Sequence, residues 1–449
     1  MTTQASAGHL LRLIRAERAT TRGELQRITG LSRSTVGHRL DQLFRAGWVR
    51  EVAGDPALPS TGGRPAVRLE FDAHHAVVLC ADLDTRHARA GVLDLSGAVL
   101  AEHTGSLLVN DGPDEVLDRL CRWFAMLLEK AGVAPATVCG IGLAVPGPVD
   151  FATGRVVDPP MMPGWDGFPV RERMRQAFAE HVGRVDRAEA RRGAQMHSGG
   201  AQASGGRAPG DSAPSSSERG ASPAPAASSA PPEHLTAMPV LVENDANVLA
   251  YAEQRHGFPD CSAFLLVKVS TGIGAGVVVD GEMYRGIDGG AGDIGHIRLM
   301  DRTDALCRCG SYGCLAAVAS GRALAEQLTA CGIPTASGSG VRDQLAIGQP
   351  DAVRLAREAG RVVGEVLATV VTLLNPGVLV IAGDLAGPPF VTGVRELLYQ
   401  RAMPRTTAYL QVVTSRLGER AGLAGAAAMV VEHLYAPERA DARLVALGL

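Results

Sequence analysis

The 449-residue sequence predicts an α/β protein of two similar lobes, preceded by a small helical head with a pair of strands. Three observations predict this organisation. Residues 10–43 have helical periodicity with capping signals, and residues 1–51 carry a net positive charge. Segments 77–100 and 263–283 repeat one pattern of strand, tight loop, strand, turn and strand. Strands that are followed at a distance by helices favour an α/β body.

The charge is unevenly divided between head and body. Residues 1–51 contain nine Arg against four acidic residues, a net charge of +5, whereas the whole chain carries -3. A basic head on an acidic body indicates a polyanionic partner at the N-terminal end. An exposed, Arg-rich helix pair without such a partner explains the charge equally well.

The head has the spacing of a helix-turn-helix. Residues 10–14 give the apolar face of a first helix, and residues 21–24 have the capping-box pattern that opens a second. Gly30 is placed to end that second helix, and Ser32 to cap a third. The inward positions of the third helix are Val36, Leu40 and Leu43.

The outward side of the third helix is polar and basic, as in a recognition helix that meets base edges and phosphates. The residues we predict to bind DNA are Arg33, Ser34, Thr35, His38 and Arg39. Strands at 48–52 and 67–71, joined by a turn-rich segment at 56–64, predict a wing. The alternative is a three-helix bundle that binds another protein.

Four metal-ligating side chains fall within 19 residues: His296, Cys307, Cys309 and Cys314. Three thiolates and an imidazole form a closed tetrahedral set with no open position, so they predict a structural Zn²⁺ site. The sequence opens without a signal peptide and has no apolar run of about 18 residues. We therefore predict a cytoplasmic protein without membrane contact, in which clustered Cys bind metal rather than form disulfides. The alternative for the clustered Cys is that they are buried thiols that bind no metal.

The duplicated, hairpin-led unit resembles the actin/hexokinase-like architecture, in which hairpin loops hold nucleotide phosphates and a sugar lies in the cleft. More specifically, the chain resembles the ROK family of repressors and sugar kinases, in its repressor branch. The matching segments cover almost the whole chain. Besides the helix-turn-helix they are 62–65, 142–148, 163–165, 243–247, 271–276, 292–296, the Cys cluster and 375–376.

The resemblance implies a sugar site made by Asn244, Asp245, Asp293 and His296, with His296 also a zinc ligand. In the kinases, the aspartate that matches Asp245 is the general base on the sugar hydroxyl. The alternative for Asp245 is a structural turn carboxylate. Asp293 stands where the family usually has Glu, and Ala316 replaces a second sugar-binding Glu. We expect these changes to weaken binding or to shift the ligand preference.

The first phosphate loop also departs from the kinases. Where they read Asp-Ile-Gly-Gly-Thr, residues 82–86 read Asp-Leu-Asp-Thr-Arg, and Asp84 would repel a polyphosphate. The second loop, 271–276, keeps its glycines, but a tight hairpin is enough to explain them. We therefore predict no phosphotransfer and no enzymatic activity.

Four domains are predicted: a winged helix-turn-helix at 1–72, a first ROK lobe at 73–184, an insertion at 185–235, and the remainder of the ROK domain at 236–449. Gly, Ala, Ser and Pro dominate the insertion, and large apolar residues are absent between positions 196 and 235. Such a segment cannot bury enough apolar area to offset its ordering entropy, so we predict a disordered linker.

Together these features predict a transcriptional regulator, most simply a repressor, of carbohydrate-related genes. It would bind a double-stranded DNA operator as a homodimer or homotetramer, and a sugar or sugar phosphate effector would modulate that binding. Two alternatives remain: a ROK sugar kinase with a fused DNA-binding domain, and a DNA-binding regulator that responds to no ligand.

Overall fold

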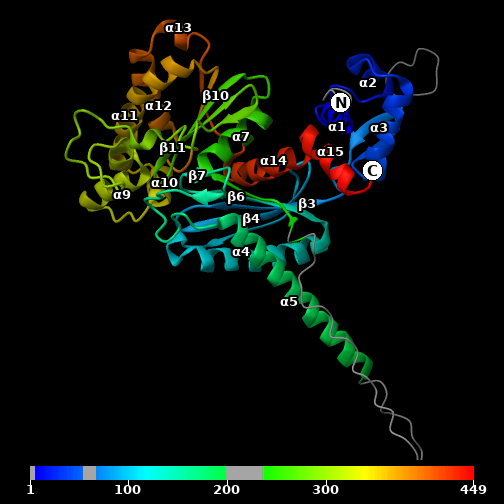
Figure 1. Cartoon of the computed structure of the whole chain (residues 1–449). Helices are drawn as coiled ribbons and strands as arrows, with labels where there is room; N and C mark the ends of the chain where they lie inside the picture. The colour runs from blue at the N-terminus through cyan, green and yellow to red at the C-terminus, as the bar shows by residue number, and fades with distance from the viewer. Residues whose placement is uncertain (1–5, 54–66, 199–234, 236) are drawn as a thin grey trace, which may run out of the picture.

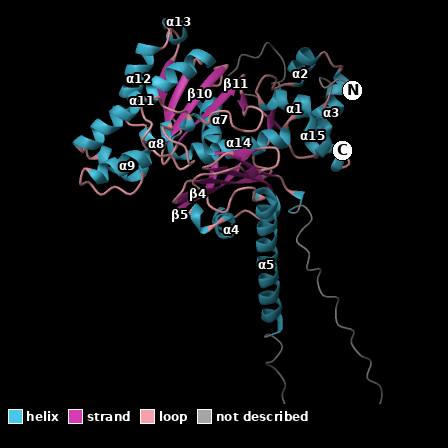
Figure 2. Cartoon of the chain, turned by 60° about the vertical axis from the view of Figure 1, so that its left-hand side comes forward, coloured by secondary structure: helices cyan, strands magenta, loops and turns pink. Residues whose placement is uncertain are grey.

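The computed structural model describes residues 6–53, 67–198, 235 and 237–449. Two lobes lie side by side, with a small head beside them and one long helix projecting from the body (Figure 1). The helix nearest the C-terminus lies against the head (Figures 1 and 2).

The head contains the three predicted helices, α1 (Ala7–Arg15), α2 (Arg22–Thr29) and α3 (Arg33–Arg45). The capping box is confirmed, because the Thr21 side chain accepts from the Glu24 N–H and Glu24 reaches back to the N-cap. Gly30 ends α2 in the left-handed conformation at φ 69°, and Ser32 caps α3. Their apolar faces make the head's core, with Leu10, Leu25 and Leu40 at 0% exposure.

A pair of antiparallel strands, β1 (Val49–Val52) and β2 (Arg68–Phe71), follows the helices as the wing prediction requires. The predicted turn at 56–64 lies outside the described residues. Trp48, at the start of the pair, is 2% exposed and packs edge-on against Tyr435 at 5.3 Å between ring centroids.

Each lobe is built on a five-stranded mixed sheet of the same design. The first has the order β5-β4-β3-β6-β9 and the second β12-β11-β10-β13-β14; an antiparallel hairpin leads each, and parallel strands extend it. The strands of the first sheet are β3 (Val77–Leu83), β4 (His87–Asp94), β5 (Val99–Ser106), β6 (Val138–Val145) and β9 (Val240–Asn244). Those of the second are β10 (Ala263–Val269), β11 (Ile273–Val279), β12 (Glu282–Tyr284), β13 (Val378–Ala382) and β14 (Gln411–Thr414). The predicted duplication is therefore confirmed.

Helices cover both faces of each sheet. The outer helices are α4 (Pro113–Ala131) and α5 (Val170–Ser198) on the first lobe, and α8 (Leu315–Ala319), α9 (Gly321–Ala330), α10 (Gly338–Ala346), α11 (Pro350–Leu374), α12 (Pro388–Arg401) and α13 (Pro404–Thr407) on the second. Two helices, α7 (Asp245–Gly257) and α14 (Ala421–Tyr435), form a middle layer between the sheets (Figure 1). A short ribbon, β7 (Val149–Asp150) with β8 (Arg155–Val156), lies beside the first sheet.

In the middle layer, glycines of α14 bring its backbone into direct contact with α7 and β3. A Cβ built on Gly425 of α14 would lie 2.2 Å from the carbonyl oxygen of Val248 in α7. Gly422, one turn earlier, lies against the carboxylate of Asp82 in β3. Only glycine permits these approaches, so α14 is fixed between strand β3 and helix α7.

The head is attached to the body through the last helix, α15 (Pro437–Ala446), which packs on α1 (Figure 2). The Gly8 N–H donates to Asp441 Oδ1 at 2.8 Å. The Arg443 guanidinium lies 4.8 Å from the ring centroids of both Trp48 and Tyr435. Aromatic and cation–π contacts of this kind make a directional joint rather than a flexible tether.

The predicted insertion at 185–235 is wrong in its first part. Helix α5 enters the predicted insertion, continues to Ser198 and projects from the body (Figure 2). Residues 185–198 contain three Ala and three Arg, which have high helix propensity. Most of the insertion, 199–234, lies outside the described residues. Among the described residues, no helix has the length and apolar character that crossing a membrane requires.

Candidate metal centre and ligand cleft

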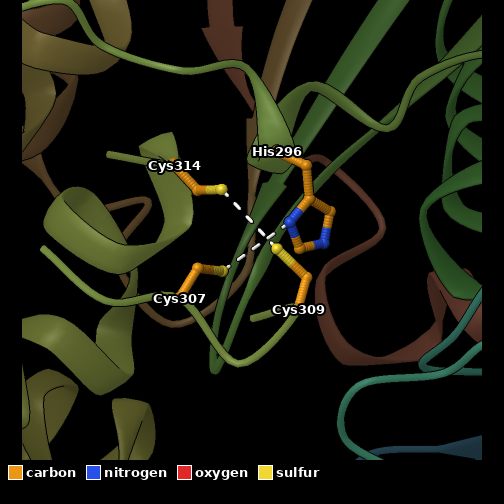
Figure 3. Close-up of side chains that lie close together, drawn as sticks. All are labelled: His296, Cys307, Cys309 and Cys314. Atoms are coloured by element: carbon orange, nitrogen blue, oxygen red, sulfur yellow. Dashed lines mark hydrogen bonds between the residues drawn. The ribbon is translucent and has the colours of Figure 1, made fainter. Parts of the chain in front are cut away.

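The four predicted metal ligands converge at one point (Figure 3). His296 ends a 3₁₀ turn (Ile294–His296), Cys307 and Cys309 lie in the following loop, and Cys314 is the N-cap of α8. The turn can pack this closely because Gly292 has φ 98°, and a Cβ there would lie 2.0 Å from the Ala275 oxygen. The motif at 292–296 is therefore held against the glycine hairpin.

The spacing of the four side chains fits a tetrahedral metal. Their ligand atoms all lie within 4.8 Å of one another, with Cys307 Sγ 3.7 Å from His296 Nδ1 and Cys309 Sγ 3.7 Å from Cys314 Sγ. Zn–S bonds of about 2.3 Å would place sulfurs roughly 3.8 Å apart on a tetrahedron. The donor set and its dimensions therefore suit a closed metal site, and only small shifts would be needed to bind an ion.

A cleft between the lobes runs beside this cluster and contains every residue of the predicted sugar site. His296 contributes to both, because Nδ1 faces the sulfurs while Nε2 lies 3.9 Å from Asp293 Oδ1. A metal on Nδ1 would fix the ring and its tautomer, and so would fix what Nε2 offers to the cleft. Asp293 is exposed at the rim, and Ala316 lines the wall without offering a polar atom.

The side chains of Asn244 and Asp245 both form hydrogen bonds within the protein. Asn244 caps α7, with Oδ1 accepting from the Ala246 and Asn247 N–H groups and Nδ2 donating to the Gly147 oxygen. Asp245 Oδ1 accepts from the Ala246 N–H, and Oδ2 from Lys268 Nζ at 2.5 Å. Both carboxylate oxygens therefore accept one hydrogen bond within the protein, which leaves fewer lone pairs for a ligand.

Asn247, which was not among the predicted site residues, is the other polar group of α7 in the cleft. It is 2% exposed, and its Nδ2 donates to Glu243 Oε1 at 3.0 Å. Among the described residues its Oδ1 has no hydrogen-bond partner. An unpaired buried acceptor costs about 1–3 kcal/mol, so a ligand hydroxyl at this point would be favoured. The only sequence signal was its position in the 243–247 motif.

Lys268 is a second group that the sequence interpretation missed. Burial acts to lower the pKa of Lys268, but the carboxylates of Asp245, Asp84 and Asp82 outweigh it and raise the pKa well above its usual range. Desolvation raises the pKa of Asp82 to about 6, although Lys268 opposes the shift. Burial also acts to raise the pKa of Asp84, but Lys268 and the Thr85 N–H lower it overall. A lysine in an otherwise apolar strand was the available signal.

The predicted DNA-binding residues lie on α3 at the surface of the head. Arg33, Ser34 and His38 are exposed, whereas Thr35 and Arg39 are half-buried. Ser34 and Thr35 share hydrogen bonds with the Ser32 cap at 2.9 and 2.8 Å. The N-terminal half of α3 therefore presents a polar face to solvent.

The comparisons with known proteins agree with this architecture. The sequence profile of the ROK family matches residues 231–433. The xylose repressor of Caldicellulosiruptor bescii is 24% identical over 453 residues, which cover 96% of each chain. The glucokinase of Streptomyces coelicolor is 33% identical over 222 residues, which cover 44% of this chain and 69% of the kinase. A crystal structure of a ROK family transcriptional regulator, a homologue of the E. coli MLC protein, matches with a TM-score of 0.71 at 23% identity over 99% of both chains.

Fold and site together define a two-lobed, actin/hexokinase-like protein that carries a winged helix-turn-helix head. The chain belongs to the ROK family.

Proposed function

We propose that this protein is a DNA-binding transcriptional repressor of carbohydrate-related genes whose operator binding responds to a sugar or sugar-derived ligand. One observation carries the proposal: the same chain has a polar, solvent-facing helix in the head and a cleft in the body. The cleft is lined by Asn244, Asp245, Asp293 and His296. Full-length similarity to a xylose repressor supports the same reading.

Residues 33–39 of α3 and the β1–β2 wing are the proposed DNA surface. Arg33 and His38 are exposed near the helix N-terminus, where side chains of a recognition helix reach bases and phosphates. A homodimer or homotetramer would place two such heads on the half-sites of a roughly palindromic operator.

The proposed cofactor is one structural Zn²⁺ held by His296, Cys307, Cys309 and Cys314. With four protein ligands it would have no position for a substrate, so its role would be to fix the 292–314 loop and the His296 ring. The Nε2 side of His296, Asp293 and Asn247 would then contact ligand hydroxyls.

One continuous path supports coupling between ligand and head. Helix α7 begins at Asp245 in the cleft and carries Arg255 near its other end. Arg255 Nη2 lies 3.5 Å from Glu432 Oε2, and the same oxygen is 3.4 Å from Arg15 Nη2 of α1. Arg15 is largely buried at 13% side-chain exposure. A shift of α7 on ligand binding would therefore move a carboxylate that the head shares with the body.

The test is operator binding by the purified full-length protein. An operator selected from random duplexes would be bound with nanomolar affinity that falls steeply with salt. The double variant Arg33→Ala/His38→Ala should bind it at least ~10-fold more weakly, while Arg354→Ala, on the body surface, should bind normally. A selection that enriches no sequence would refute the DNA-binding proposal.

A panel of sugars and sugar phosphates, D-xylose included, would then be added to the operator complex. The effector reading expects one compound to change operator affinity; compounds that bind without any such change would favour the ligand-independent alternative. Sugar-dependent ATP turnover would instead support the kinase alternative, which the loss of both glycines at 82–86 argues against.

A further inference from the structure

One cation faces the middle of the molecule from the second sheet. In β10, Leu265, Val267 and Val269 belong to the outer core with α11 and α12, whereas Phe264 and Leu266 pack toward α7. Because side chains alternate along a strand, Lys268 points to the α7 side. Its side chain is only 15% exposed.

Carboxylates from the first lobe lie close to the Lys268 ammonium. Val78 and Cys80 of β3 belong to the core shared with α14, so alternation puts Asp82, and Asp84 beyond it, on that inner face. These two carboxylates, with Asp245 of α7, are the charges that act on the Lys268 ammonium. Three elements and both lobes therefore meet at one lysine.

The hairpins of the two lobes also touch directly at this point. Thr85 Oγ1, after β3, lies 3.3 Å from Thr271 Oγ1, after β10. On one side is the ligand cleft and on the other a second pocket, lined by Arg89, Arg342 and Glu419 among others. Asp84, Lys268 and Ser270 line both, so they form the wall between them.

We propose that Lys268 is an internal cation that joins the two lobes and positions Asp245 as a wall of the ligand cleft. This inference deepens the ligand site proposed above and rests on it. Its chemical consequence is specific: without the ammonium, three carboxylates face one another, and the vacated space becomes a binding site for a small external alkylammonium ion.

The first experiment uses wild-type protein, because Lys268 and Lys130 are the only two lysines of the chain. Lys130 is exposed on α4 and serves as the internal reference. Brief treatment with an amine-acylating reagent, followed by peptide mass spectrometry, should modify Lys130 while sparing Lys268 at least ~50-fold, a protection lost in denaturant. Equal rates at the two lysines in the folded protein would overturn the proposal.

The second experiment is chemical rescue of Lys268→Ala with n-propylammonium, which supplies the carbons and ammonium that the substitution removes. The variant should melt several degrees below wild type, and millimolar propylammonium should restore at least half of that loss. Tetramethylammonium, which cannot donate a hydrogen bond, should not restore the melting temperature, and neither should NaCl. Lys130→Ala should match wild type under every condition.

Binding of D-xylose provides the readout that separates positioning from mere stability. If the wild type binds D-xylose, Lys268→Ala should lose at least ~10-fold in affinity at a temperature where it is folded, and propylammonium should recover it. Lys268→Ala that binds D-xylose normally, or that melts identically with propylammonium and NaCl, would overturn the proposal. If Lys268→Ala does not fold, the acylation rates decide. Acylation and rescue do not depend on operator binding, so this inference and the proposed function can fail separately.

Discussion

At the scale of single residues, the site combines an ordered metal-ligand set with a ligand wall that is already hydrogen-bonded internally. Asn244 and Asp245 already form hydrogen bonds within the protein, to the N-terminus of α7, the Gly147 oxygen and Lys268. Asn247, in contrast, has a side-chain oxygen without a hydrogen-bond partner among the described residues. The unpaired Asn247 oxygen is therefore the acceptor of α7 that is most available to a ligand hydroxyl.

Replacing Cys309 with Ser should remove the metal and destabilise the protein by about 2 kcal/mol or more, because the loop that holds His296 loses its anchor. Metal analysis and thermal unfolding should report the two losses together. Cys331→Ser is the matched control, since Cys331 is an exposed thiol outside the cluster. Lower stability with full zinc content would show that Cys309 is not a ligand.

Asp82→Asn should change how stability depends on pH. Desolvation raises the pKa of Asp82 from 3.8 to about 6 in the folded protein. The native state then holds more protons than the unfolded chain in this range, so the contribution of Asp82 to stability falls as the pH rises from about 4 to about 6. Denaturant unfolding across that window should give a smaller decrease for the variant than for wild type. Parallel curves would contradict the assignment.

At the scale of elements, glycines decide how close the middle layer packs. Gly425→Ala should destabilise the protein by about 1–3 kcal/mol, because its Cβ would meet the Val248 oxygen at 2.2 Å. Gly23→Ala, in α2 with no atom within 4 Å of the added Cβ, should instead stabilise it by about 0.5–1 kcal/mol. Urea unfolding of both variants tests the contrast, and equal effects would refute the packing argument.

Elements with strong local signals could be predicted from the sequence. The capping box at Thr21 and Glu24, the helix stop at Gly30 and the duplicated hairpins all depend on neighbours in the chain. The metal ligands were also predictable because they lie within a short segment. The role of Lys268 could not be predicted, because it depends on Asp82 and Asp84, which lie almost two hundred residues earlier in the chain. The extension of α5 was missed because composition was weighed above helix propensity.

At the scale of the whole molecule, the proposed ligand cleft lies at the start of α7, and the head is linked to the other end of this helix through Glu432. Glu432 of α14 pairs with Arg255 of the body and Arg15 of the head. Glu432 and the neighbouring aromatic cluster of Trp48, Phe71 and Tyr435 are therefore two routes, besides the contact of α15 with α1, by which a shift in the body could reach the head.

Glu432→Gln should weaken the coupling while leaving both binding sites intact. Operator affinity without ligand and sugar affinity without DNA should each stay within about threefold of wild type, whereas the sugar-induced change, typically 5- to 150-fold in such systems, should fall toward one. Glu396→Gln is a close control, because Glu396 also bridges two arginines, Arg357 and Arg361, but on the surface of the second lobe. An unchanged sugar response in Glu432→Gln would exclude this path.

The docking of α15 on α1 also bears on how the protein is made. A ribosome synthesises the head first, whereas α15, which packs on it, begins only at Pro437. Until Asp441 and Arg443 arrive, Gly8 lacks its partner and Trp48 its covering guanidinium. Part of the surface of the head therefore stays uncovered until α15 has been synthesised. The final geometry of the head therefore depends on a helix that follows the whole two-lobed body in the sequence.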